Sequence, residues 1–161
     1  MRSPVRLRVI ILDDEPLIRR LLFTVLDRRG SEVFTFADPG DCPLHGVLEC
    51  PCPAGARCAD VILSDVQMGE IDGIDFVRDL THKGCRQPHF ELMSARWHTA
   101  AITRAERLKC PLLAKPVATA NVIRWLEQIE LSISPDRTPV EWHQLGQAVG
   151  AQQSANREMV L

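Results

Sequence analysis

The 161-residue sequence has no long apolar run, no basic excess and no internal repeat. No stretch approaches the roughly 18 apolar residues of a membrane-spanning helix, so we expect no membrane insertion. A net charge of -2 offers no basic stripe for nucleic acid, so direct DNA binding is not expected. The amino terminus passes through three arginines into a short apolar run, which is not the pattern of a signal peptide. The expectation is one domain in the cytoplasm.

Short segments rich in β-branched residues alternate along the chain with segments whose apolar residues recur at helical spacing. The expected strands cover residues 7–12, 32–36, 59–65, 88–94 and 110–114. The expected helices cover residues 16–29, 73–80, 97–108 and 118–131. Parallel neighbouring strands need a crossover connection, so this alternation predicts an α/β fold with a doubly wound parallel sheet. Sites in such sheets lie at the carboxyl ends of the strands.

Two segments depart from this alternation. Prolines, glycines and four cysteines fill residues 38–58, where a helix would be expected. Each proline removes an amide donor and biases the preceding residue away from helical geometry, so we expect an irregular segment there. Residues 132–161 form a polar tail, too short for an output domain, in which residues 140–149 could form a short helix.

Polar side chains follow four of the expected strands at the same, carboxyl, end. Asp13 and Asp14 follow the first strand, Asp65 ends the third, Ser94 ends the fourth and Lys115 follows the fifth. Three neighbouring carboxylates cannot all stay ionised unless a cation compensates them. Carboxylate oxygens with open positions beside them suit Mg²⁺, which keeps waters and bridges to phosphate. The pattern therefore predicts a phosphoryl-transfer site built around a divalent cation.

Four short motifs carry a family resemblance. They are Leu12-Asp13-Asp14-Glu15-Pro16, Ser64-Asp65-Val66-Gln67-Met68 followed by Asp72-Gly73, Met93-Ser94-Ala95, and Ala114-Lys115-Pro116. With these motifs in order, residues 6–131 resemble the receiver domain of two-component response regulators, of the single-domain chemotaxis-regulator type. The resemblance implies a flavodoxin-like, five-stranded sheet of order 2-1-3-4-5. Residues 1–131 would form the receiver domain, with the cysteine-rich segment 38–58 in place of its second helix.

The resemblance also implies a function. Asp65 would accept a phosphoryl group from a sensor histidine kinase or a phosphotransfer protein, and Lys115 and Ser94 would contact that group. The implied Mg²⁺ ligands are Asp13, Asp14, Asp65 and the backbone carbonyl of Gln67. The protein would act as a phosphoprotein in a phosphorelay rather than as an enzyme. It would signal by docking to a downstream protein or to a second copy of itself, through a surface around Trp97, Arg104 and Arg107.

The cysteines leave several interpretations open. Four of them lie within 17 residues: Cys42, Cys50, Cys52 and Cys58. Four thiolates could bind Zn²⁺ in a tetrahedral site, although this spacing is not that of common zinc motifs. Disulfides are a second interpretation and unpaired thiols a third. A fourth uses topology: Cys58, Cys85 and Cys110 each precede one of three neighbouring strands, so all three would lie near the edge opposite the acidic site. A metal- or thiol-based redox sensor on the same fold is therefore the alternative function.

Overall fold

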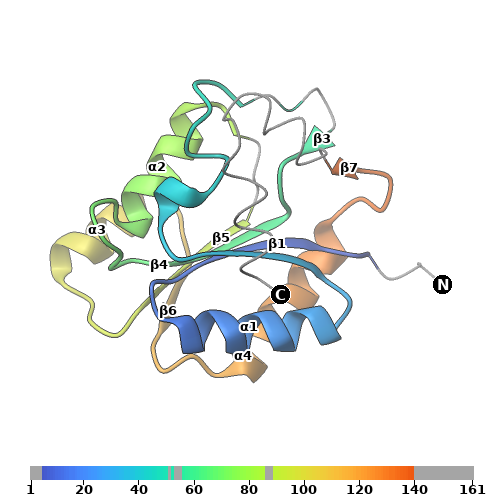
Figure 1. Cartoon of the computed structure of the whole chain (residues 1–161), viewed down its shortest axis with the longest axis horizontal. Helices are drawn as coiled ribbons and strands as arrows, with labels where there is room; N and C mark the ends of the chain where they lie inside the picture. The colour runs from blue at the N-terminus through green and yellow to red at the C-terminus, as the bar shows by residue number, and fades with distance from the viewer. Residues whose placement is uncertain (1–4, 51, 53–55, 86–88, 140–161) are drawn as a thin grey trace.

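Figure 1 shows the computed structural model, which describes residues 5–50, 52, 56–85 and 89–139. The strands are β1 (Arg8–Leu12), β2 (Glu32–Phe36), β3 (Ala56–Arg57), β4 (Val61–Asp65), β5 (His89–Ser94), β6 (Leu112–Ala114) and β7 (Thr138–Pro139). The α-helices are α1 (Pro16–Arg28), α2 (Gly73–His82), α3 (Thr99–Arg107) and α4 (Thr119–Ser132). Among the described residues, no helix is long and apolar enough to cross a membrane.

Five strands form one parallel sheet in the order β2-β1-β4-β5-β6. Counted along the chain without the short β3, this is the predicted order 2-1-3-4-5, and the prediction is confirmed. In the register, Leu12 lies beside Ser64 and Asp65 lies beside Met93. The carboxyl ends of β1, β4 and β5 therefore meet at one edge of the sheet.

Helices cover both faces of the sheet (Figure 1). On one face, Leu22 and Leu26 of α1 and Leu126 of α4 pack against Val9 and Leu63. On the other face, α2 and α3 pack against the sheet beside the cysteine-rich segment. All five residues of β1 and all five of β4 are buried, as expected for strands covered on both sides.

The first helix begins and ends as its sequence predicts. Pro16 occupies the first turn, where its missing amide costs no hydrogen bond. Gly30 follows the helix with φ of +92°, a conformation that favours glycine, and its amide donates to the Asp27 carbonyl at 2.8 Å. This short connection sends the chain directly from α1 into β2.

The segment between β2 and β4 is irregular, as predicted. Its described residues form a 3₁₀ turn at Pro39–Asp41 and the short strand β3, and no α-helix. The Cys50 amide donates to the Lys83 carbonyl at 2.9 Å, and the Lys83 ammonium donates to the His45 carbonyl at 2.7 Å. The segment is thereby attached to the carboxyl end of α2.

The first residues beyond α4 also pack on the domain. β7 pairs with β3 in a separate two-stranded parallel sheet. The Arg137 guanidinium forms a buried ion pair with Asp60, and its Nη2 donates to the Arg6 carbonyl at 2.8 Å. These contacts fix residues up to Pro139 near the amino ends of β1 and β4. The helix predicted for residues 140–149 lies outside the described residues.

Candidate functional site

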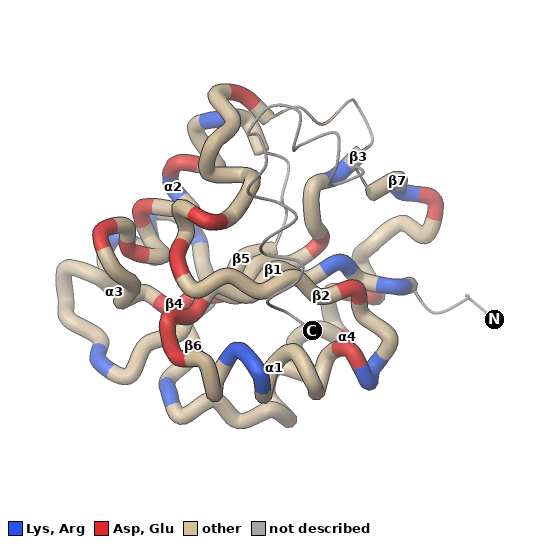
Figure 2. Tube along the Cα trace, viewed as in Figure 1, with Lys and Arg blue, Asp and Glu red and all other residues tan. Residues whose placement is uncertain are grey.

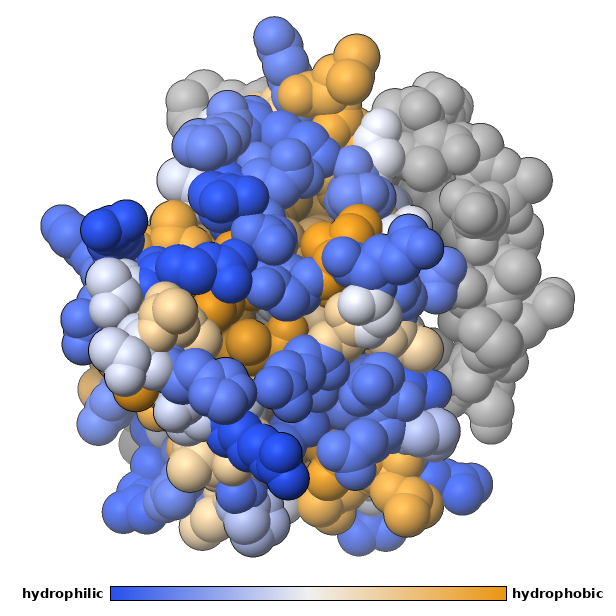
Figure 3. Space-filling model, turned by 90° about the vertical axis from the view of Figure 1, so that its left-hand side faces the viewer, coloured by the Kyte–Doolittle hydropathy of each residue, from blue (hydrophilic) through white to orange (hydrophobic). Residues whose placement is uncertain are grey.

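The predicted acidic residues gather at one end of the sheet. Asp13 and Asp14 follow β1 and Asp65 ends β4, and Figure 2 shows these acidic positions together where the two strands finish. Carboxylate oxygens of the three residues all lie within 4.8 Å of one another. Asp13 and Asp65 are buried, whereas Asp14 is exposed. Figure 3 faces this side of the molecule, where hydrophilic residues surround a smaller hydrophobic area.

Lys115 supplies the positive charge of this group. Its ammonium nitrogen lies 2.8 Å from Oδ2 of Asp13 and 3.2 Å from Oδ2 of Asp65. It also lies 3.4 Å from the exposed carboxylate of Glu15. The Lys115 amide donates to the Ser94 carbonyl at 2.9 Å, which extends the β5–β6 pairing to this residue, and the Lys115–Pro116 peptide is cis.

The charges at this edge are not fully balanced. Burial and the nearby Asp13 charge raise the pKa of Asp65 to about 6, although Lys115 acts in the opposite direction. Burial lowers the pKa of Lys115, but its hydrogen bonds and charge interactions with Asp13 and Asp65 outweigh this and raise it overall. One ammonium group therefore leaves room for additional positive charge beside Asp65.

Local backbone contacts hold the carboxylates in place. The Glu15 amide donates to Oδ1 of Asp13 at 2.9 Å, and the Gln67 amide donates to Oδ1 of Asp65 at 3.3 Å. Arg19 donates to the Asp13 carbonyl at 2.6 Å, a contact that sequence reasoning missed. Arg19 is one helical turn beyond the acidic motif, so spacing alone could have suggested it.

The Ser94 hydroxyl is buried and bonded within its own loop. It donates to the Arg96 carbonyl at 2.7 Å and accepts from the Arg96 amide at 3.1 Å. Ser94 is thus placed at the same edge as Asp65, with its hydroxyl held by the chain that leads into α3.

Gly73 is a second residue whose role sequence reasoning missed. A Cβ atom at Gly73 would lie 2.1 Å from the backbone oxygen of Asp65 and 2.6 Å from Oγ of Ser64. The Gly73 amide donates to the Val66 carbonyl at 2.9 Å, so α2 begins directly against the end of β4. The Asp72-Gly73 pair signalled the motif, but only the packing shows why glycine is required.

The family model described as the response regulator receiver domain matches residues 9–127, most of the chain. The chain belongs to the response regulator receiver family. Receiver domains are signal receivers rather than enzymes, and membership implies a phosphoacceptor function.

Relatives of the receiver domain include both short and long proteins. The protein named "Probable chemotaxis protein CheY" of Rhizobium etli is 28% identical over 126 residues, 77% of this chain and 92% of that protein. A probable transcriptional regulatory protein of Picosynechococcus is 27% identical over 116 residues, 72% of this chain and 46% of that protein. KdpE of Escherichia coli, the KDP operon transcriptional regulatory protein, is 39% identical over 72 residues, 45% of this chain and 28% of that protein. The chain spans less than half of both transcriptional regulators.

Solved structures show the same receiver fold. Chemotaxis protein CheY4 of Vibrio cholerae matches with a TM-score of 0.62 and 20% identity, covering 78% of this chain and 99% of that one. The Francisella response regulator 1452 receiver domain matches with a TM-score of 0.65 and 18% identity. The match covers 79% of this chain and 98% of that one. At these identities the comparison establishes the architecture.

The group formed by Asp13, Asp14 and Asp65 at the carboxyl ends of the strands, here called the acidic edge, fits Mg²⁺. Its donors are carboxylate oxygens, the hard ligands that Mg²⁺ prefers. They lie within 4.8 Å of one another, and burial with the Asp13 charge raises the pKa of Asp65 despite Lys115. A divalent cation would relieve that excess of negative charge.

A second group of chemically active side chains lies where the cysteine-rich segment meets the turn after α2. The sulfur atoms of Cys50, Cys58 and Cys85 all lie within 4.8 Å of one another, and those of Cys50 and Cys58 are 3.8 Å apart. Hydrogen bonds with Cys58, and with Cys50, lower the pKa of Cys52 to about 6. The same contact with Cys52 raises the pKa of Cys58 far above its ordinary value.

This grouping corrects the expected sets of cysteines. Cys42 is buried among core residues beside Leu44 and Phe76, and burial raises its pKa to about 12. Cys85 joins Cys50 and Cys58 instead. Cys110 packs in a different cluster, against α2 and α3, and is not among the sulfurs that lie within 4.8 Å of one another. No disulfide joins the six cysteines, all of which the structure describes.

The expected docking surface also contains an internal contact. Arg104 of α3 lies 2.9 Å from Oδ2 of Asp72 and 2.7 Å from Oδ1 of Asp75, at the start of α2. Trp97 precedes α3 rather than beginning it. Its partly buried side chain packs against the hydrophobic cluster between α2 and α3 that also contains Cys110. Arg104 therefore connects α3 to α2, which makes it a poor probe of docking alone.

Proposed function

We propose that this receiver domain accepts a phosphoryl group on Asp65 from a phosphohistidine of a sensor histidine kinase or phosphotransfer protein. The observation that carries this is the position of Lys115, whose ammonium bridges Asp13 and Asp65 at the common edge of the strands. Asp13, Asp14, Asp65 and the backbone carbonyl of Gln67 would hold Mg²⁺. When bound, Mg²⁺ would offset the charge of the phosphoryl oxygens and of the carboxylates.

Asp65 is the nucleophile in the proposed step. One of its carboxylate oxygens attacks the phosphorus atom, the phosphorus–nitrogen bond breaks, and the imidazole leaves with a proton taken from solvent. The Gln67 amide donates to Oδ1 of Asp65, which leaves Oδ2, on the Lys115 side, to attack. Burial that raises the pKa of Asp65 also keeps competing water away from the carboxylate.

Lys115 would neutralise charge during transfer. Its ammonium already lies 3.2 Å from the attacking carboxylate, so a phosphoryl group on Oδ2 would come within its reach. Its contact with Asp13 prevents the long side chain from extending into solvent. Lys115 would thus change partner from one carboxylate to the phosphoryl oxygens with little movement.

Ser94 would couple phosphorylation of Asp65 to a rearrangement of the surface. To reach a phosphoryl oxygen, its hydroxyl must give up the hydrogen bonds with Arg96. The loop that leads to Trp97 and α3 would then rearrange, and a partner would recognise this surface. The partner would be a downstream protein or a second copy, and the domain would bind no DNA directly.

The test is phosphorylation of Asp65 by a small phosphodonor. Wild-type protein incubated with acetyl phosphate and Mg²⁺ should gain one phosphoryl mass, and Asp65→Asn should gain none. Asp27→Asn is the matched control, because Asp27 is an exposed aspartate in α1. Undiminished labelling of Asp65→Asn, or labelling of wild type that excess chelator leaves unchanged, would contradict the proposal.

A further inference from the structure

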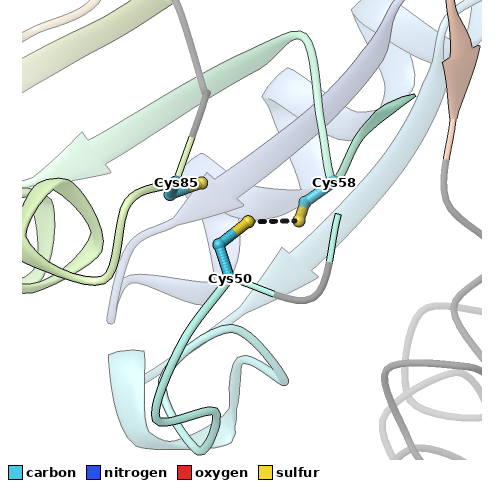
Figure 4. A group of neighbouring side chains, drawn as sticks. All are labelled: Cys50, Cys58 and Cys85. Carbon is cyan, nitrogen blue, oxygen red and sulfur yellow. Dashed lines mark hydrogen bonds between the residues drawn. The ribbon is translucent and has the colours of Figure 1, made fainter. Parts of the chain in front are cut away.

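The thiol cluster lies away from the acidic edge of the domain and has no part in the proposed phosphoryl transfer. Figure 4 shows the side chains of Cys50, Cys58 and Cys85 directed toward one another from three different stretches of chain. Cys50 lies in the irregular segment, Cys58 precedes β4, and Cys85 follows α2. Two thiols from the segment between β2 and β4 and one from the turn after α2 therefore converge.

The spacing of the sulfur atoms matches a metal site. Four sulfurs about 2.3 Å from a tetrahedral Zn²⁺ are separated from one another by about 3.8 Å. The Cys50 and Cys58 sulfurs are 3.8 Å apart, and Cys85 lies within 4.8 Å of both. Cys52 is not one of the three sulfurs that all lie within 4.8 Å of one another, but it interacts with Cys58 and Cys50 and is the nearest candidate for a fourth ligand.

We infer that Cys50, Cys52, Cys58 and Cys85 bind one Zn²⁺ ion as a closed, structural Cys₄ site. Thiolates are ligands that suit Zn²⁺, which structural sites hold with four protein ligands, and four such ligands leave no position for a substrate. The ion would connect the segment between β2 and β4 to the end of α2. It would take the place of the helical packing that the prolines prevent in this segment.

The surroundings of the cluster support an anionic metal site. One Zn²⁺ and four thiolates carry a net charge of -2, which requires nearby cations or amide donors. Arg8 is buried, and its Nη1 lies 3.4 Å from the Cys58 carbonyl. The hydrogen bond from the Cys50 amide to Lys83 holds the Cys50 backbone beside the turn that carries Cys85.

Chain geometry explains how Cys85 reaches the other ligands. The Cys85 amide donates to the Leu80 carbonyl at 3.0 Å, which closes the end of α2. Gly84 has φ of +73°, a conformation that favours glycine and turns the chain toward the cluster. The ligand set is therefore formed by folding, with the last ligand 27 residues beyond Cys58 in the sequence.

Metal content is the direct test. Full-length protein is purified under reducing conditions, stripped with chelator, reloaded with Zn²⁺ and measured by elemental analysis. We expect one zinc per chain, and Co²⁺ in its place should give the absorption of tetrahedral cobalt thiolate. Cys85→Ser and Cys50→Ser should each weaken zinc binding by at least about 10- to 100-fold, since altering even an outer-shell partner costs that much.

Matched controls separate the cluster from the other thiols and from the acidic site. Cys110→Ser and Cys42→Ala should retain one zinc, and Asp65→Asn should bind zinc as wild type does, whatever its phosphorylation. Absence of zinc and of the cobalt signature in folded wild type would overturn the inference. So would iron in place of zinc in the protein before stripping, full zinc binding by Cys85→Ser, or a Cys50–Cys58 disulfide that persists under reducing conditions.

Discussion

Lys115 has three carboxylates within 3.4 Å of its ammonium nitrogen, from Asp13, Glu15 and Asp65. Two of these carboxylates are buried, so each depends on a neighbouring positive charge. This lysine therefore contributes to stability and to the proposed chemistry at once. The two contributions can be separated, because Mg²⁺ would replace the lysine charge but not its contact with a phosphoryl group.

We predict that Lys115→Met lowers the free energy of unfolding in metal-free buffer by about 3 kcal/mol, since it leaves buried carboxylates unpaired. Added Mg²⁺ should recover much of this loss, while the rate of phosphorylation stays at least about tenfold below wild type. Urea unfolding with and without Mg²⁺ measures the first effect and intact mass measures the second. Lys109→Met, at an exposed lysine, is the control. An equal loss with and without Mg²⁺ would contradict the prediction.

Glu91 is a buried carboxyl in β5 whose Oε2 has no hydrogen-bond partner among the described contacts. Burial raises its pKa from 4.5 to about 7. The folded protein therefore binds this proton more tightly than the unfolded chain does. The contribution of protonated Glu91 to the free energy of unfolding is fully present below about pH 4.5. It is lost as the pH rises through about 7, where the buried carboxyl ionises.

Glu91→Gln should remove this pH dependence. Relative to the variant, wild type should lose up to about 3 kcal/mol of unfolding free energy between pH 4.5 and 8. The measurement is the difference in unfolding free energy between the two proteins, determined by urea unfolding at each pH. Groups that both proteins share, such as Asp65, contribute equally and drop out of this difference. A difference that does not change over this range would show that Glu91 does not titrate there.

At the scale of elements, α2 begins against the end of β4. Gly73 has no Cβ, and this lets the helix approach the carbonyl of Asp65, the proposed phosphoacceptor. Asp72 accepts from the Asp75 amide at 2.7 Å and also pairs with Arg104 of α3. One short turn therefore positions β4, α2 and α3 together, directly beside the acidic edge.

Gly73→Ala should destabilise the domain, although glycine-to-alanine changes within helices usually stabilise by up to about 1 kcal/mol. The new Cβ would meet backbone at 2.1 Å, so we expect a loss of about 1–3 kcal/mol from overpacking, together with slower phosphorylation of Asp65. Chemical unfolding and phosphodonor labelling measure the two effects. A variant as stable and as active as wild type would show that the turn can move without consequence.

Across the whole molecule, local sequence patterns predicted the sheet, its helices and the acidic edge. Strand ends of a parallel sheet share one edge, so Asp13, Asp65 and Lys115 had to meet once the strands were recognised. Contacts between side chains that are far apart in the sequence depend on how the whole chain packs, and they could not be predicted in this way. Cys85 replaces Cys42 in the thiol cluster, and Asp60 pairs with Arg137, 77 residues away. No periodicity in the chain indicates either choice.

The two ends of the sheet therefore carry different kinds of interaction. The carboxyl end holds carboxylates that are only partly neutralised, which suits a site that changes charge. The amino end holds the Asp60–Arg137 ion pair, in which both side chains are at least nine-tenths buried. Asp60 also accepts from the Arg8 amide at 2.8 Å. We expect a fully paired, hydrogen-bonded charge of this kind to hold the end of the domain in one arrangement.

Arg137→Met should lower the free energy of unfolding by about 3–5 kcal/mol, because it leaves the buried Asp60 carboxylate without its partner. Adding Asp60→Asn to that variant should recover part of the loss, since the uncompensated charge is then absent. Arg29→Met, which removes a more exposed arginine paired with Glu127, should cost less than about 1 kcal/mol. Phosphorylation of Asp65 should be unchanged in the folded variant, because Arg137 acts at the opposite end of the sheet. Equal losses for Arg137→Met and Arg29→Met in urea unfolding would show that the buried pair does not hold the chain beyond α4 in place.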